Sequence, residues 1–180
     1  MKSFGTCGHY RAKPLAFVYP QTPCPKLWIS PDVGGLKMAY AYAQQLDAEL
    51  AIVAKRRKSP TETEATAVIG DIAGKNVLIV DDLTETAGTL TSAATLLKER
   101  GAEKIMACVS HALLNDLGIE RLRKSSIDEL ITTDTVARSA VSGVNITTLS
   151  VAGLLGEAIK RIHQNSSVTS LFEFKGGRTS

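Results

Sequence analysis

Short runs of apolar residues alternate along the chain with longer stretches in which apolar residues recur every three or four positions. The short runs predict β-strands, at 26–30, 50–53, 67–70, 77–80, 105–109, 130–132 and 146–149. The periodic stretches predict helices, over 39–46, 90–97, 114–124 and 151–162. Gly101 is well placed to end the second helix, and Ser150 to cap the last one. Such alternation is typical of an α/β fold, so we expect a mostly parallel sheet with helices on both faces.

Two connections interrupt this alternation. Residues 55–66 are charged and rich in threonine, which predicts a mobile loop. Residues 73–76, Ala-Gly-Lys-Asn, are short enough to join the strands at 67–70 and 77–80 as a hairpin. We therefore expect one short hairpin beside the parallel strands.

The first 26 residues follow neither pattern and carry four of the six prolines. Proline-rich stretches without periodicity favour irregular structure. The sequence therefore predicts three parts: an irregular arm at 1–26, one α/β domain at 27–174 and a short tail at 175–180. A length of 180 residues agrees with a single domain.

Composition and charge exclude several classes of protein. Hydrophobic residues make up 44% and charged residues 22% of the chain, which is usual for a globular fold and too apolar for a disordered one. A net charge of +3 and scattered aromatic residues argue against nucleic acid as a partner. No apolar stretch reaches the roughly 18 residues that span a bilayer, and the N-terminus lacks the apolar core of a secretory signal. Three cysteines without a CxxC pair argue against a disulfide framework, so we expect a cytoplasmic protein without a membrane partner.

The segment that says most about chemistry runs from 77 to 89. A buried apolar strand leads directly into Asp81 and Asp82, and the turn Thr-Ala-Gly-Thr (86–89) then opens a helix. Backbone N–H groups at the start of a helix form an anion site, and Gly88 lets the backbone approach a phosphate closely. Two carboxylates beside such a site suit sugar hydroxyls or a hydrated Mg²⁺. The pattern fits a sugar phosphate held at both ends; the alternative is that the aspartates cap the helix across a plain tight turn.

Two further segments follow predicted strands and so point to the same edge of the sheet. In Ser-Pro-Asp-Val-Gly-Gly (30–35) the glycines can wrap a phosphate and Asp32 can reach a metal bound to it; a plain turn with Asp32 as helix cap is the alternative. In Lys-Arg-Arg-Lys (55–58) the cations can neutralise a transferring phosphoryl group; a solvated charged face is the alternative. The basic residues at 121–124 are most simply a solvated helix end.

Several segments also form a recognisable series. They are Ser-Pro-Asp-Val-Gly-Gly (30–35), Ala-Lys-Arg-Arg (54–57), Ile-Gly-Asp-Ile-Ala-Gly-Lys-Asn-Val-Leu (69–78), Ile-Val-Asp-Asp-Leu-Thr-Glu-Thr-Ala-Gly-Thr (79–89), Ile-Lys-Arg-Ile-His (159–163) and Ser-Val-Thr-Ser-Leu-Phe (167–172). The segment 79–89 looks like the ribose-phosphate-binding loop of the type I phosphoribosyltransferase fold. Together the six resemble the ribose-phosphate pyrophosphokinases, which are the synthetases of phosphoribosyl pyrophosphate (PRPP). The resemblance covers roughly 27–172 in uninterrupted order, which makes it more specific than any single motif.

This resemblance implies a transferase of nucleotide biosynthesis. Family members transfer the β,γ-diphosphoryl group of ATP to the C1 hydroxyl of ribose 5-phosphate with Mg²⁺, giving PRPP and AMP. The expected ligands are therefore ribose 5-phosphate, PRPP and Mg²⁺, with ATP as a further candidate. The residues that carry over by position are, for the diphosphate, Asp32, Gly34 and Gly35; for catalysis, Lys55 and Arg57; for ribose 5-phosphate, Asp81, Asp82, Glu85, Thr86, Ala87, Gly88 and Thr89; and for the metal, Asp32, Asp81 and Asp82.

The chain also departs from the family pattern. Nothing in it resembles the family's N-terminal domain, which supplies much of the adenine site and contacts between subunits. Glu85 stands where the family usually has Asp, and residues 113–117 and 134–144 differ from the family. The chain therefore looks like the C-terminal, substrate-bearing domain, and the missing domain argues against activity of this chain alone. We expect a homo-oligomer or a partner that supplies the missing domain.

Three functions remain open. The first is an enzyme domain of PRPP synthetase type, which the retained Lys55 and Arg57 favour. The second is a non-catalytic sugar-phosphate-binding or regulatory module associated with synthetases, which the missing adenine site favours. The third is a nucleobase phosphoribosyltransferase, which needs a segment covering the base, for which the arm at 1–26 is the only candidate.

Overall fold

The computed structural model describes residues 27–30, 36, 39–40, 43, 49–57, 63–137 and 141–171, of which 28, 55–57 and 63–66 are described by their backbone. Its elements in chain order are β1 (Leu27–Ser30), β2 (Glu49–Arg57), β3 (Thr63–Ile69), β4 (Val77–Thr84), α2 (Gly88–Glu99), β5 (Ile105–Ala112), α3 (Asp116–Arg123), β6 (Glu129–Thr133), β7 (Ile146–Leu149), α4 (Ala152–His163) and the short 3₁₀ helix η1 (Thr169–Leu171). The predicted arm at 1–26 and tail at 175–180 lie outside the described residues.

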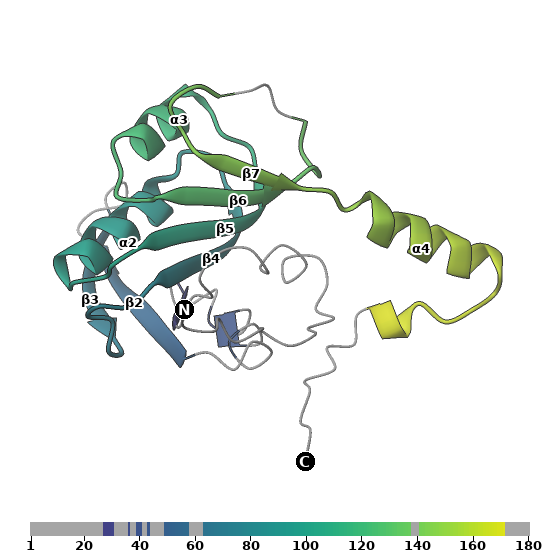
Figure 1. Cartoon of the computed structure of the whole chain (residues 1–180), viewed down its shortest axis with the longest axis horizontal. Coiled ribbons are helices and arrows are strands. Elements are labelled where there is room, and N and C mark those ends of the chain that lie inside the picture. The colour runs from purple at the N-terminus through teal and green to yellow at the C-terminus, as the bar shows by residue number, and fades with distance from the viewer. Residues whose placement is uncertain are drawn as a thin grey trace, which may run out of the picture.

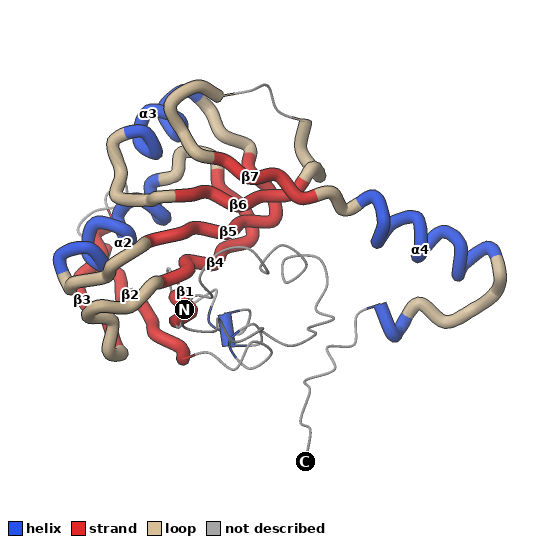
Figure 2. The backbone as a smooth tube through the Cα atoms, in the orientation of Figure 1, coloured by secondary structure: helices blue, strands red, loops and turns tan. Residues whose placement is uncertain are grey.

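The strands form one seven-stranded sheet in the order β3-β2-β1-β4-β5-β6-β7 (Figures 1 and 2). Every neighbouring pair is parallel except β2 and β3, which run antiparallel. The expected mostly parallel α/β sheet is therefore confirmed.

The hairpin, however, forms between different strands from those expected. The sequence predicts that 67–70 pairs with 77–80, but β3 pairs with β2, and β4 lies between β1 and β5. The short turn is real, since the Lys75 N–H donates to the Ile72 carbonyl at 3.1 Å. It redirects the chain without pairing the strands, because the apolar run that opens β4 is buried within the sheet and takes a partner on each side.

The loop expected at 55–66 is also shorter than predicted. β2 continues to Arg57 and β3 begins at Thr63, with a register shift between Ala54 and Lys55. Backbone pairing of two strands does not require apolar side chains, so charged and threonine-rich residues can extend the ribbon. Residues 58–62 lie outside the described part.

The core has two layers, one on each face of β4, because successive side chains of a strand point to opposite faces. One layer joins alternate residues of β4 to the inner side of α2, and includes Val77, Ile79, Leu90, Ala93 and Leu97. The other layer, on the opposite face, includes Ala43, Leu78, Val80, Met106, Cys108 and Ile131. The buried run of β4 ends at Val80, so the residues that follow it leave the core at the carboxyl edge of the sheet.

Cys108 lies within this second layer, 2% exposed. Burial raises the pKa of its thiol from 9.0 to about 12, because the apolar surroundings disfavour the thiolate.

This pKa shift predicts a pH-dependent stability. Below pH 9 the thiol is neutral in both states, whereas above it only the unfolded chain ionises Cys108, and each further pH unit costs about 1.4 kcal/mol. Urea denaturation should therefore show the wild type losing about 2 kcal/mol relative to Cys108→Ala between pH 8 and pH 10.5. If the free energy of unfolding changed with pH in the same way for the wild type and Cys108→Ala, the raised pKa of the buried thiol would be contradicted.

Helix α4 projects away from the sheet beyond β7 (Figure 1), and none of its residues is buried. Its apolar side chains Leu155, Ile159 and Ile162 are all more than half exposed. The helix begins with Val151 at the N-cap, one residue later than expected, and the Ala152 N–H donates to Ser150 Oγ at 3.2 Å. None of the described helices combines the length and apolar character needed to cross a membrane.

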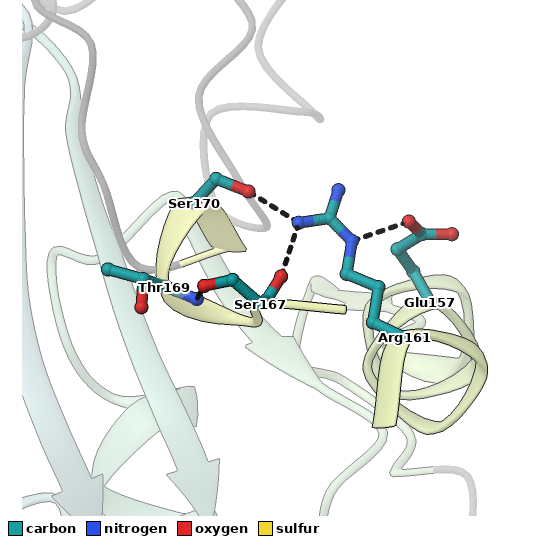
Figure 3. Close-up of polar contacts among 5 residues, drawn as sticks. All are labelled: Glu157, Arg161, Ser167, Thr169 and Ser170. Carbon is teal, nitrogen blue, oxygen red and sulfur yellow. Dashed lines mark hydrogen bonds and ion pairs between the residues drawn. The ribbon is translucent and has the colours of Figure 1, made fainter. Parts of the chain in front are cut away.

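Arg161 of α4 ties the C-terminal segment to this helix (Figure 3). Its Nε donates to Glu157 Oε1 at 2.7 Å, and its Nη1 donates to the Ser167 carbonyl at 3.3 Å and to Ser170 Oγ. Two of the six sequence segments, 159–163 and 167–172, are thus joined by one guanidinium group.

Candidate functional site

The strand order locates the site. From β1 the chain continues to β2 on one side, whereas β4 lies on the other side of β1 and leads on to β5. Parallel sheets bind ligands where the strand order reverses in this way, beyond the carboxyl ends of the strands. The strand order therefore favours a ligand position between the carboxyl ends of β1 and β4.

The sequence segments selected for their chemistry lie next to this reversal point. β1 ends at Ser30, the first residue of the segment 30–35, and β4 ends within 79–89. β2 runs parallel to β1 and carries the backbone of Lys55 and Arg57 beyond the position of Ser30, which pairs with Ile52. Asp32, Gly34 and Gly35 lie outside the described residues.

Asp81 and Asp82 lie where β4 leaves the core. Pairing with β1 ends at Ile79, whereas pairing with β5 continues to Thr84, so this part of β4 extends past the end of β1. Asp81 is half-buried, and its Oδ1 accepts the backbone N–H of Asp82 at 3.0 Å. The Asp82 side chain is exposed, and the alternation of a strand directs it to the face opposite Asp81. A ligand lying across the strand end can meet both carboxylates.

The turn after β4 adopts an uncommon backbone conformation. Ala87 has φ +53° and ψ +10°, in the left-handed region, and is the N-cap of α2. A residue in this conformation bends the chain so that successive N–H groups converge on one point, which is the geometry of an anion-binding nest. The strain of a left-handed alanine is of the kind that gathers at ligand sites.

Helix α2 begins at Gly88 with its N-terminus available to an anion. The side chain of its N-cap residue, Ala87, makes no capping hydrogen bond, and its first turn contains no acidic residue. The N-cap position is thus occupied by Ala87 and not by Asp81 or Asp82. The first N–H groups of a 12-residue helix point out of its end with a partial positive charge, which favours a phosphate there.

Sequence reasoning missed one residue beside this turn. Arg121 of α3 donates from Nη1 to the Thr86 carbonyl at 3.1 Å, so it is more than a solvated helix end. The same atom would lie 3.0 Å from a Cβ added at Gly88. Gly118 is the available signal, because a glycine inside a helix often marks a close approach of another backbone.

Comparison with known proteins gives the family. The profile of the phosphoribosyl synthetase-associated domain family matches residues 41–173. The chain belongs to this family. The expected resemblance to PRPP synthetases is thereby confirmed.

Relatives of this phosphoribosyl synthetase-associated domain carry the name ribose-phosphate pyrophosphokinase. The chain is 44% identical over 146 residues to the protein of Chromobacterium violaceum, covering 80% of this chain and 45% of that one. It is 40% identical over 160 residues to ribose-phosphate pyrophosphokinase A of Dictyostelium discoideum, covering 88% and 50%. The chain thus spans about half the length of these relatives.

Solved structures agree on the fold. The phosphoribosylpyrophosphate synthetase of Mycobacterium smegmatis aligns with a TM-score of 0.67 at 30% identity, over 79% of this chain and 46% of that one. An adenine phosphoribosyltransferase of Giardia lamblia aligns with a TM-score of 0.52 at 19% identity, over 66% and 73%. The phosphoribosyl synthetase-associated domain therefore has the phosphoribosyltransferase fold.

The carboxylates of this domain fit a Mg²⁺ ion that binds together with a phosphate substrate. In the described part, no three His, Cys, Asp or Glu side chains come together as a metal site. Mg²⁺ bound with a phosphate substrate usually keeps several waters and takes only one or two protein carboxylates. Asp81 and Asp82 lie on opposite faces of the strand end and are at least partly accessible, so either can supply such a carboxylate.

Proposed function

We propose that this chain binds ribose 5-phosphate and PRPP, with Mg²⁺, as the acceptor-side half of a PRPP-synthetase-type transferase. One observation carries the proposal: a carboxylate pair leads directly into a left-handed turn and an uncapped helix N-terminus beside the reversal point of the sheet. Carboxylates suit ribose hydroxyls, and the converging N–H groups suit a phosphate. The family relationship supports the same ligands.

Each proposed residue has one task in this scheme. Asp81 and Asp82 accept hydrogen bonds from the ribose hydroxyls and orient the ring. The turn from Glu85 to Thr89 holds the 5-phosphate through its backbone N–H groups and threonine hydroxyls. Mg²⁺ would be held by one or two of the carboxylates of Asp32, Asp81 and Asp82, and would supply positive charge to the diphosphate.

The donor side of the reaction is assigned to the neighbouring strand ends. Asp32, Gly34 and Gly35 are proposed to meet the diphosphate, and Lys55 and Arg57 to neutralise the diphosphoryl group during transfer from ATP. Cations placed there stabilise the charge that spreads over the transferring oxygens. We propose that adenine is held by residues other than those assigned here, those of another subunit included.

A second candidate function is a regulatory module that binds sugar phosphate without catalysis. None of the residues proposed here is assigned to adenine, which fits such a module, because a catalyst of this reaction must also position ATP. Both candidates use the same acceptor-side residues.

Titration calorimetry tests the acceptor side. PRPP should bind in a Mg²⁺-dependent manner, and Asp81→Asn/Asp82→Asn should weaken binding tenfold or more, since losing a charged hydrogen-bond partner costs about 1.5–3 kcal/mol. The matched control is Glu99→Gln/Glu103→Gln, which removes the same charge from two exposed positions, the last residue of α2 and one beyond it. Equal affinity of the Asp81/Asp82 variant and the wild type would contradict the proposal.

A further inference from the structure

The turn at 84–87 is held from outside by residues 113–121. Three successive carbonyls of the turn each accept one hydrogen bond from that segment. The donors are the Leu113 N–H to Thr84 at 2.9 Å, the Asn115 N–H to Glu85 at 3.2 Å, and Arg121 Nη1 to Thr86 at 3.1 Å. We call residues 113–121 the clamp.

The clamp determines where the turn's N–H groups point. In a trans peptide the C=O and the following N–H point in opposite directions. Drawing the carbonyls of residues 84–86 toward the clamp therefore aims the N–H groups of residues 85–87 away from it. These N–H groups are among those proposed to receive the phosphate.

Gly118 brings the clamp into backbone contact with the turn. A Cβ at this position would lie 2.4 Å from the Glu85 carbonyl oxygen, too close for any residue but glycine without a backbone shift. The Gly118 N–H donates to Asn115 Oδ1 at 2.9 Å, which caps the start of α3. The first turn of α3 is therefore fixed against the Glu85 peptide.

Arg121 is the part of the clamp that acts through a side chain. It is exposed, spans 35 positions of sequence to reach Thr86, and lies over Gly88 at the start of α2. The Thr86 peptide that it holds directly precedes the left-handed Ala87.

We propose that Arg121 is a positioning residue for the phosphate-binding turn. It fixes the peptide between Thr86 and Ala87 so that the Ala87 N–H is aimed at the phosphate before the ligand arrives. This inference rests on the proposed function, because it names the residue that orients the backbone of the same phosphate site before binding.

The test compares Arg121→Ala with Arg123→Ala, a neighbouring variant on the same helix. Arg123 donates to the Ser142 carbonyl at 3.0 and 2.9 Å and so holds a different loop. Ribose 5-phosphate affinity, measured by calorimetry, should fall about tenfold in Arg121→Ala and less than about twofold in Arg123→Ala. Arg121→Lys, which keeps a charged donor, should recover most of the lost affinity.

A second readout needs no ligand. Amide NMR signals and hydrogen-exchange rates of Ala87 and Gly88 should change in ligand-free Arg121→Ala and stay unchanged in Arg123→Ala, with both variants melting near the wild-type temperature. Wild-type affinity or unchanged turn amides in Arg121→Ala would overturn the inference. A wild-type chain that binds no ribose 5-phosphate overturns the proposed function instead, and the amide comparison still decides whether Arg121 shapes the turn.

Discussion

The purified chain, given ATP, ribose 5-phosphate and Mg²⁺, is expected to release AMP with a kcat/KM at least about a thousandfold below that of a full-length ribose-phosphate pyrophosphokinase. Positioning two reactants correctly can contribute about 7–11 kcal/mol to catalysis, and each 1.4 kcal/mol is a factor of about ten in rate. The residues proposed here orient ribose 5-phosphate and meet the diphosphate, whereas none of them is assigned to adenine. ATP should therefore bind loosely and seldom in line with the acceptor.

Two controls make this measurement decisive. The residual AMP release should disappear in Lys55→Ala if the proposed cation acts on the diphosphoryl group. Adding a separately produced N-terminal half of a related synthetase should raise the rate if this chain is one part of a split enzyme. Fast turnover by the chain alone that depends on Lys55 would contradict the expectation that residues other than those assigned here are needed to hold ATP.

Replacing Leu90 by alanine is expected to destabilise the chain by about 2–5 kcal/mol, because truncating a buried leucine removes apolar contacts and leaves a cavity. Leu90 is 0% exposed and lies in the core layer between α2 and β4. It also belongs to the first turn of α2, so it anchors the helix whose N-terminus forms the proposed phosphate site.

The matched control for Leu90→Ala is the same substitution at Leu155 of α4. That side chain is 55% exposed, and its truncation should change the free energy of unfolding by no more than about 0.5 kcal/mol. Urea denaturation of both variants measures the difference. Similar losses at the two positions would mean that α4 packs against the rest of the chain in solution.

The sequence predicts the strands and helices of the described part well, because each buried element carries its own apolar period. Helix α3, for example, lies within the predicted 114–124. The partners of the strands are harder to predict, since the turn at 73–76 has the same local signal whether it closes a hairpin or only redirects the chain. The position of β3 depends instead on the open edge of β2, which is a property of the assembled sheet.

The sequence predicts the segment that forms the candidate site, but not the residues from other elements that hold that segment in place. The segment 79–89 is continuous in sequence, so its carboxylates and turn can be recognised directly. The contact of Arg121 with Thr86 joins residues 35 positions apart, and no local pattern encodes it. The sequence also favours Gly88 as the special backbone position, whereas the positive φ falls on Ala87 and the small size of Gly88 leaves room for Arg121.

The clamp changes what counts as a transferable module for protein engineering. Grafting residues 81–89 alone into another parallel sheet would carry the side chains and leave behind the donors that orient the peptides. The smallest portable unit runs from β4 through α3, because both sides of the three hydrogen bonds then travel together. Within that unit the exposed side chain of Glu85 is open to redesign, since the clamp holds this residue through its backbone carbonyl.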